Sequence, residues 1–393
     1  MTKNLLIIIS ISTSIFAQNM NDFAKEQMDG FKKEKSKFST YKDNTYKEFQ
    51  EYKTKQNKAF LEYQKELNSF WKNPKFSTNK AWVSYTKDKK TQTDVDFEKE
   101  TIIIKTIANS KKFATQRLQN ALKKVITIDT KTAYQNDPLE QRLAKIKKPI
   151  GMIDKPLKAE PILTTVIFEK MPTQAQIDSY VHKNTLNINV EKSTKIRHEN
   201  IYSVAVVLPK NSMIKRSKLY YKDVKKQANK QNIPIPLVFA IMHSESSFNP
   251  RARSHVPAYG LMQIVPRTAG IDTYYYLYKK KRLVSGRYLY DSTNNITMGT
   301  AYLHILYYKY LKDIKNPDSR LFCTIAAYNT GAGNVAWAFT KTNNMKKAAP
   351  RINKLTPKQV YNRLLRDLKY DEPKHYLKKV SKRMAAYHKV YGF

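Results

Sequence analysis

The pattern of apolar residues changes near Pro209, and this change is the strongest constraint on the fold. Before it, β-branched runs such as Val95 to Lys105 are typical of strands and alternate with helical stretches. After it, apolar residues recur at helical spacing and strand signals disappear. We therefore predict an α+β chain, with a mixed helix and strand domain over residues 18–209 and an all-α domain over residues 210–393. A length of 393 residues also fits two domains better than one.

The expected elements follow from this periodicity. In the N-terminal domain we predict strands over 82–85, 95–105, 162–168 and 201–208, and helices over 111–126 and 174–182. In the C-terminal domain we predict helices over 217–229, 236–246, 297–311, 317–328 and 357–370. The last of these opens with Thr356, Pro357 and Gln359, which have the spacing of a capping box with proline in the first turn.

Residues 22–71 carry aromatic side chains at helical spacing without proline, which predicts one or two long amphipathic helices. Such a stripe packs on its own domain more often than it binds another surface. Binding to the cell wall or to a second copy is the alternative, and the sequence leaves it open.

The N-terminus has the pattern of a secretory signal peptide over residues 1–17: Lys3, an apolar run from Leu5 to Phe16, and then the small residue Ala17. We predict cleavage after Ala17, with retention as an anchor as the alternative. No later segment has the composition of a membrane span. The single cysteine, Cys323, excludes an intramolecular disulfide and lies in an apolar run, where a buried structural role is expected.

The chain has 72 Lys and Arg against 32 Asp and Glu, a formal charge of +40, which favours polyanionic partners. An exported protein meets wall peptides and anionic lipid headgroups before it meets DNA. We therefore expect peripheral contact with an anionic membrane surface and no nucleic acid partner. A lysine-rich composition without any binding role is the alternative.

Glu245 is the strongest candidate for chemistry. In the predicted helix over 236–246 it shares one face with Val238, Ile241 and Met242, which places a carboxyl group on an apolar stripe. Burial disfavours the charged form of a carboxyl group and makes it a general acid near neutral pH. The periodicity alone is equally compatible with a glutamate at an exposed, frayed helix end.

Three motifs follow in order: E-S-x-F-N-P at Glu245–Pro250, G-L-M-Q at Gly260–Gln263 and A-Y-N-x-G at Ala327–Gly331. Together they resemble the lytic transglycosylases, whose catalytic domain is lysozyme-like and related to goose-type lysozymes. Residues 291–303 look like the intermediate helix of that family, and residues 375–380 look like its final tyrosine motif. Residues 82–104 are similar to the N-terminal domain of a membrane-bound subfamily.

The resemblance implies cleavage of peptidoglycan glycan strands between N-acetylmuramic acid and N-acetylglucosamine, with formation of 1,6-anhydromuramic acid ends. It implies Glu245 as the single catalytic acid and base. The substrate-binding residues that it implies are Ser254, Met262, Gln263, Tyr328, Asn329 and Tyr376. Core roles are the alternatives for Met262 and Tyr376.

Members of that subfamily typically carry a lipid anchor on a cysteine, but no cysteine follows the apolar run here. We therefore expect a protein of the Gram-negative periplasm without such an anchor. Asp272 and Asp291 are candidates for a second carboxylate, although both positions suit a structural role. His243 and His255 lack the partners of a metal site, so neither metal nor cofactor is expected. A hydrolytic muramidase of the goose type and a non-catalytic wall-binding protein are the rival functions.

Overall fold

The computed structural model describes residues 47–254 and 257–392. The predicted signal peptide and residues 22–46 of the predicted amphipathic helices lie outside the described residues. The chain divides into two compact units, one of residues 1–60 with 144–150 and one of residues 61–143 with 151–393. In the first unit the chain is helical from residue 47, the first residue that the structure describes, and the backbone N–H of Ile150 donates to Glu48 Oε2 at 3.0 Å. This helix ends at residue 68, in the second unit.

The second unit contains a five-stranded sheet in the order β1-β2-β3-β5-β4, with every neighbouring pair antiparallel. The predicted strand over 95–105 is instead a hairpin, because the chain turns at residues 97–100. Asp96 Oδ1 accepts the backbone N–H groups of Glu98 and Lys99, and Glu100 has a positive φ of 58°. The strands are β1 (Ala81–Tyr85), β2 (Thr91–Asp96), β3 (Thr101–Ala108), β4 (Asn189–Lys192) and β5 (Asn200–Val207).

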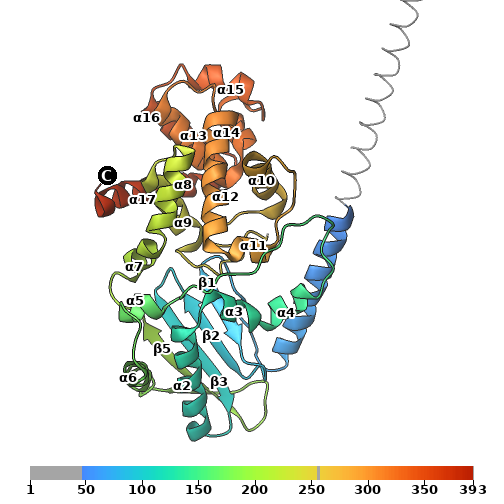
Figure 1. Cartoon of the computed structure of the whole chain (residues 1–393), viewed down its shortest axis with the longest axis vertical. Helices are drawn as coiled ribbons and strands as arrows, with labels where there is room; N and C mark the ends of the chain where they lie inside the picture. The colour runs from blue at the N-terminus through green and yellow to red at the C-terminus, as the bar shows by residue number, and fades with distance from the viewer. Residues whose placement is uncertain (1–46, 255–256, 393) are drawn as a thin grey trace, which may run out of the picture. The chain divides into compact units, whose positions relative to one another are not determined.

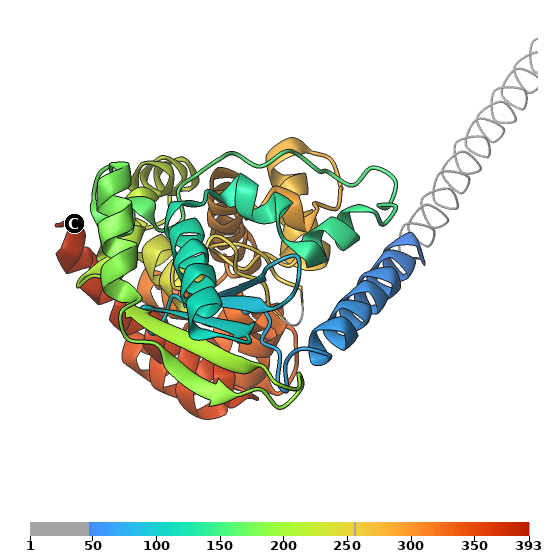
Figure 2. The same cartoon turned by 90° about the horizontal axis from the view of Figure 1, so that it is seen from below.

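The two faces of this sheet bury different clusters, as the alternation of side chains along a strand requires. Trp82, Val95 and Ile104 face a cluster that includes Leu118 and Leu122 of helix α2 (Lys111–Thr127). Figure 1 shows α2 lying across the strands, and Figure 2 shows it on the same face from below. On the other face, side chains such as Val83 pack against residues of the 63–71 segment.

Short helices complete this region, and one of them lies where a strand is predicted. The predicted strand over 162–168 is wrong, because residues Thr164–Phe168 form helix α5. The Thr164 hydroxyl donates to the carbonyl of Ile126 at 2.8 Å, which fixes α5 against the end of α2. A short apolar run cannot be assigned to strand or helix from periodicity alone. The remaining helices here are α3 (Thr130–Gln135), α4 (Pro138–Ala144) and α6 (Gln174–Asn184).

Beyond Val207 the named elements of the described chain are all helical, so the α+β class is confirmed. The predicted helix over 217–229 is two helices, which meet at Tyr220. The capping box at Thr356 and Gln359 is confirmed. The elements are α7 (Ser212–Leu219), α8 (Tyr221–Gln231), α9 (Ile235–Ser246), η1 (Pro266–Gly270), α10 (Ile271–Tyr278), α11 (Gly286–Tyr290), α12 (Ser292–Ile305), η2 (Leu306–Tyr310), α13 (Pro317–Thr330), α14 (Ala332–Thr340), α15 (Met345–Ile352), α16 (Pro357–Asp367) and α17 (Asp371–Tyr391).

Helix α9 lies in the core of this helical region. Its residues from Pro236 to Met242 are all buried, and it packs against α8 and α17. Cys323 of α13 is also fully buried in this core, where burial raises the pKa of its thiol. No helix among residues 47–254 and 257–392 is both long and apolar enough to cross a membrane.

Candidate active site

Glu245 lies on the last turn of α9, one residue before the helix ends. Val238, Ile241 and Met242 on the same face are fully buried, whereas Glu245 itself is partly exposed. Burial raises the pKa of its carboxyl group to about 7, even though a hydrogen bond from Tyr376 acts in the opposite direction. Glu245 can therefore carry a proton near neutral pH and release it.

Tyr376 of α17 fixes the carboxyl group of Glu245. Its hydroxyl donates to Glu245 Oε1 at 2.6 Å, and the side chain is only 8% exposed. Burial, together with the charge of Glu245, raises the pKa of this phenol well above its ordinary value. Tyr376 therefore stays neutral and acts as a hydrogen-bond donor at any physiological pH.

Tyr328, on the last turn of α13, lies close enough for the charge of Glu245 to act on it. Burial and then this charge raise the pKa of Tyr328 well above its ordinary value. Its hydroxyl donates to the carbonyl of Met262 at 2.8 Å, and its ring packs edge-on against Tyr302. Tyr328 therefore lies near the acid and holds the loop that carries the G-L-M-Q motif.

The loop from Gly260 to Gln263 is fixed from two sides. Ser246 of α9 donates to the carbonyl of Leu261 at 2.8 Å, and Asn295 of α12 accepts the backbone N–H of Met262 at 2.7 Å. Gly260 has a φ of +74°, and a Cβ there would collide with Asn295 and with the carbonyl of Leu289. Asn295 lies in the stretch that resembles the intermediate helix of the family, but its sequence pattern does not indicate that it holds this loop.

Gln263 has the properties of a residue that is held for a ligand. Its φ of 49° lies in the left-handed region, which is uncommon for a residue other than glycine. Its amide Nε2 donates to the carbonyl of Gly260 at 3.0 Å. Among the described residues, none donates to its buried Oε1 atom. A buried carbonyl oxygen without a donor is rare in folded proteins, so Gln263 could accept a substrate N–H or O–H group.

The other predicted binding residues occupy different surroundings. The side chain of Met262 is fully buried, and a Cβ on Gly299 would collide with it. Met262 thus lies in the core, which was the alternative role. Ser254 Oγ accepts the backbone N–H of Ala258 at 3.1 Å and so stabilises its own loop. Asn329 donates from Nδ2 to Glu372 Oε1 at 3.3 Å.

The candidate second carboxylates have structural partners. Asp291 is the N-cap of α12 and accepts the backbone N–H of Asn294 at 2.9 Å. Asp272 accepts the hydroxyl of Tyr310 at 3.0 Å. The pKa of His243 falls to about 2 because burial disfavours its charged form, while His255 lies outside the described residues. In the described part of the chain, no three His, Cys, Asp or Glu side chains are grouped as a metal site would require.

Comparison with known proteins agrees with this arrangement. Residues 223–350 match the family model described as the transglycosylase SLT domain. The matched segment contains Glu245, Gln263 and Tyr328. The resemblance to lytic transglycosylases that the three motifs indicate is thus confirmed. This protein is therefore a lytic transglycosylase.

Relatives that align with most of the chain define the family more closely. Over 315 residues the chain is 33% identical to membrane-bound lytic murein transglycosylase C of Salmonella arizonae. This alignment covers 78% of this chain and 82% of the relative. The protein of that name from Photorhabdus laumondii is 35% identical over 311 residues, covering 79% and 83%. The chain therefore belongs to the family of membrane-bound lytic murein transglycosylase C. A solved structure, the 70 kDa soluble lytic transglycosylase of Escherichia coli, matches 46% of this chain and 26% of its own length, with 25% identity and a TM-score of 0.35.

Proposed function

We propose that this chain cleaves the glycan strands of peptidoglycan between N-acetylmuramic acid and N-acetylglucosamine, and that Glu245 is its single acid and base. The observation that carries the proposal is the state of this carboxyl group. Its pKa is raised to about 7 by burial, and the hydroxyl of Tyr376 holds it at 2.6 Å. A general acid works best when its pKa lies near the working pH.

The reaction needs one proton to leave Glu245 and one to return. The protonated carboxyl group donates its proton to the glycosidic oxygen, and the bond from that oxygen to C1 of the muramic acid breaks. The muramic acid C6 oxygen then forms a bond to C1, and its hydroxyl proton passes to the Glu245 carboxylate. The products are a free 4-hydroxyl on N-acetylglucosamine and a 1,6-anhydromuramic acid end. No water is consumed, and the substrate hydroxyl replaces the second carboxylate that most glycosidases use.

The surrounding residues have binding and positioning roles in this proposal. Gln263 Oε1 is buried and accepts no hydrogen bond from any described residue, which suits an N–H group of the sugar acetamido substituent. Ser254 and Asn329 would bind sugar hydroxyl groups. Tyr328 would hold the loop of Gln263 through the Met262 carbonyl. Tyr376 would orient the acid, and the buried Met262 would support the loop from below.

We place this activity in the periplasm of a Gram-negative bacterium. Support comes from the signal-peptide pattern over residues 1–17 and from relatives named as membrane-bound. The formal charge of +40 favours adhesion to wall carboxylates and to anionic membrane surfaces. Fractionation of cells that produce the full chain would test this placement, because a cytoplasmic pool alone would contradict it.

Digestion of purified sacculi with the full chain tests the reaction itself. We expect 1,6-anhydromuramic ends by mass spectrometry, and reducing muramic ends would instead indicate a hydrolytic muramidase. A Glu245→Gln variant should lose activity by about 100-fold or more, because it cannot donate the proton. A matched Glu191→Gln variant, which alters an exposed carboxylate of β4 that pairs with Lys105, should keep the activity and the products of wild type. A chain that releases no fragments at all would leave only the wall-binding function.

A further inference from the structure

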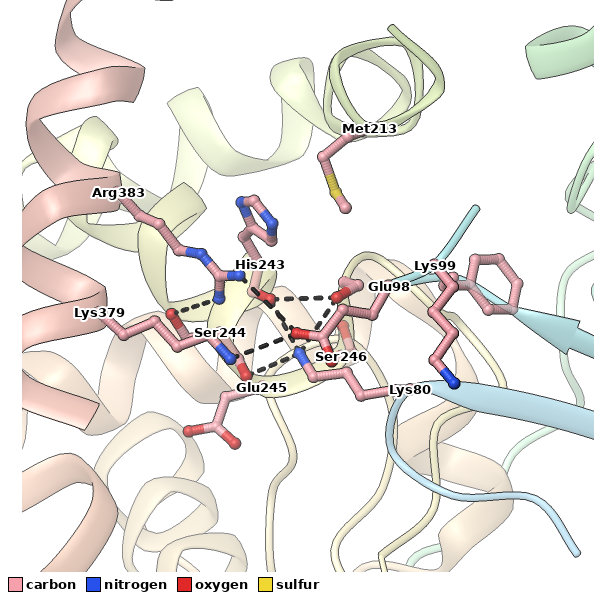
Figure 3. A network of polar contacts seen from close by, with 12 residues as sticks. Lys80, Glu98, Lys99, Met213, His243, Ser244, Glu245, Ser246, Lys379 and Arg383 are labelled. Atoms are coloured by element: carbon pink, nitrogen blue, oxygen red, sulfur yellow. Dashed lines mark hydrogen bonds and ion pairs between the residues drawn. The ribbon is translucent and has the colours of Figure 1, made fainter. Parts of the chain in front are cut away.

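The end of helix α9 is held by two residues of the N-terminal region, before the predicted domain boundary at Pro209. Asn79 and Lys80 immediately precede strand β1, and both donate to the final carbonyl groups of α9. Asn79 Nδ2 donates to the carbonyl of Glu245 itself at 2.9 Å. Figure 3 shows the Lys80 ammonium group beside this helix end, with the carboxyl group of Glu245 directed away from it.

The side-chain nitrogen of Lys80 has three acceptors at this helix end. Its Nζ atom lies 2.9 Å from the carbonyl oxygen of His243, 2.7 Å from that of Ser244 and 3.2 Å from Ser247 Oγ. The last carbonyl groups of a helix have no partner within the helix, and a positive charge there interacts favourably with the helix dipole. Lys80 therefore fixes the turn on which Glu245 lies.

A second contact of the same region holds the helix that supplies Tyr376. Glu98, in the turn between β2 and β3, lies 3.3 Å from Lys379 Nζ and 3.9 Å from Arg383 of α17. Arg383 in turn donates to Ser244 Oγ at 3.1 Å. Lys379 is three residues and Arg383 seven residues beyond Tyr376, so all three lie on the same face of α17. The contacts of Lys379 and Arg383 therefore hold the face of α17 that carries Tyr376. The sheet region thus restrains both partners of the hydrogen bond between Tyr376 and Glu245.

We infer that Lys80 is a positioning residue for the catalytic acid, through which the N-terminal sheet region sets the position and orientation of Glu245. Lys80 acts on the backbone of α9 and through its charge. It contacts neither the carboxyl group of Glu245 nor, in the proposed mechanism, the substrate. This inference rests on the function proposed above for Glu245.

The charged groups around Glu245 determine whether its pKa rises or falls when the Lys80 charge is removed. The positive charges of Lys80 and Lys379 lower the pKa of Glu245, whereas the charge of Glu372 raises it. Lys80 lies near Glu98, Lys379 and Arg383, and burial lowers its pKa to about 7, so it carries part of its charge in the pH range where Glu245 titrates. Since this charge lowers the pKa of Glu245, its removal raises that pKa. Because the protonated form of Glu245 is the active one, the alkaline limb of the pH profile should move to higher pH.

The test compares Lys80→Met and Lys80→Gln with wild type in the full chain, using soluble uncrosslinked glycan strands as substrate. Methionine has a similar shape without donors or charge, whereas glutamine can still donate two hydrogen bonds. We expect kcat of Lys80→Met to fall by about 10- to 100-fold with KM nearly unchanged, since a small misplacement of a catalytic group has effects of this size. Lys80→Gln should recover part of kcat, and both variants should share the shifted alkaline limb.

Lys105→Met is the matched control, because Lys105 of β3 pairs with Glu191 at 3.3 Å, away from α9. It should behave as wild type. Circular dichroism and thermal unfolding establish the temperature at which every variant is folded. The inference is overturned if the Lys80 variants retain wild-type kcat and pH profile, or if activity falls only with the folded fraction while the limb stays in place. An inactive wild type, or one that yields reducing ends, would instead overturn the proposed function.

Discussion

Replacement of Tyr376 by phenylalanine removes the hydroxyl that donates to Glu245 Oε1 at 2.6 Å and keeps the aromatic ring. A hydrogen bond to an ionised group contributes about 1.5–3 kcal/mol, and one between neutral groups about 0.5–1.5 kcal/mol. The hydroxyl therefore favours the carboxylate over the carboxylic acid by about 1.4 kcal/mol, which equals about one pKa unit. We expect the pKa of Glu245 to rise from about 7 in wild type to about 8 in Tyr376→Phe.

The pH dependence of kcat/KM measures this change. Glu245 donates its proton first, so kcat/KM falls as the pH rises through the pKa of Glu245. The alkaline limb of Tyr376→Phe should lie about one pH unit higher, while kcat at lower pH should fall about 10-fold because the acid is less well oriented. Tyr387→Phe is the control, since that hydroxyl lies on the same helix but 3.1 Å from His243 Nδ1. An unmoved limb in Tyr376→Phe, or an equal movement in the control, would refute the reasoning.

Two further variants test how the loop of Gln263 is supported. In Gly299→Ala the new Cβ would lie 2.8 Å from Met262 Cβ, which side-chain rotation cannot relieve. The overpacking cost of about 1–3 kcal/mol should exceed the gain of about 1 kcal/mol in helix propensity, so urea unfolding should show a net loss of stability. Asn295→Ala removes the acceptor of the Met262 N–H and the donor to the carbonyls of Tyr259 and Leu289. A loss of about 3 kcal/mol is expected by the same assay, and an unchanged midpoint would show that water replaces these bonds.

The elements that the sequence predicts well are those with local signals at their ends. Helix α16 begins at the predicted capping box, and α9 ends where the E-S-x-F-N-P motif leaves the helix. The sequence does not predict the hairpin between β2 and β3, because its turn, from Phe97 to Glu100, contains neither glycine nor proline. The segment that contains α5 predicts a strand because it is short and rich in β-branched residues, and its position against α2 favours the helix instead.

The same distinction holds for the site. The motifs place Glu245, Gln263 and Tyr328 on three nearby segments, because each motif combines a helix end or a tight loop with polar residues. The contacts of Lys80 have no such signal. Lys80 is one of many lysines, and it lies 163 positions before His243, the first residue of α9 that it contacts. Only the three-dimensional arrangement of the sheet against the helix end brings these residues together.

A mechanism with one carboxyl group makes strict demands on the position of that group, because it must reach the glycosidic oxygen first and the C6 hydroxyl afterwards. Glu245 lies on the last turn of a helix, where fraying is common. Its carboxyl group is fixed by Tyr376, its own carbonyl by Asn79 and the two preceding carbonyls by Lys80. Two of these three residues belong to the sheet region. The alignment with the Salmonella relative covers 78% of this chain, which is more than the helical region after Pro209 contains. This alignment therefore extends into the sheet region, as expected if that region completes the support of the acid and does more than attach the enzyme to a surface.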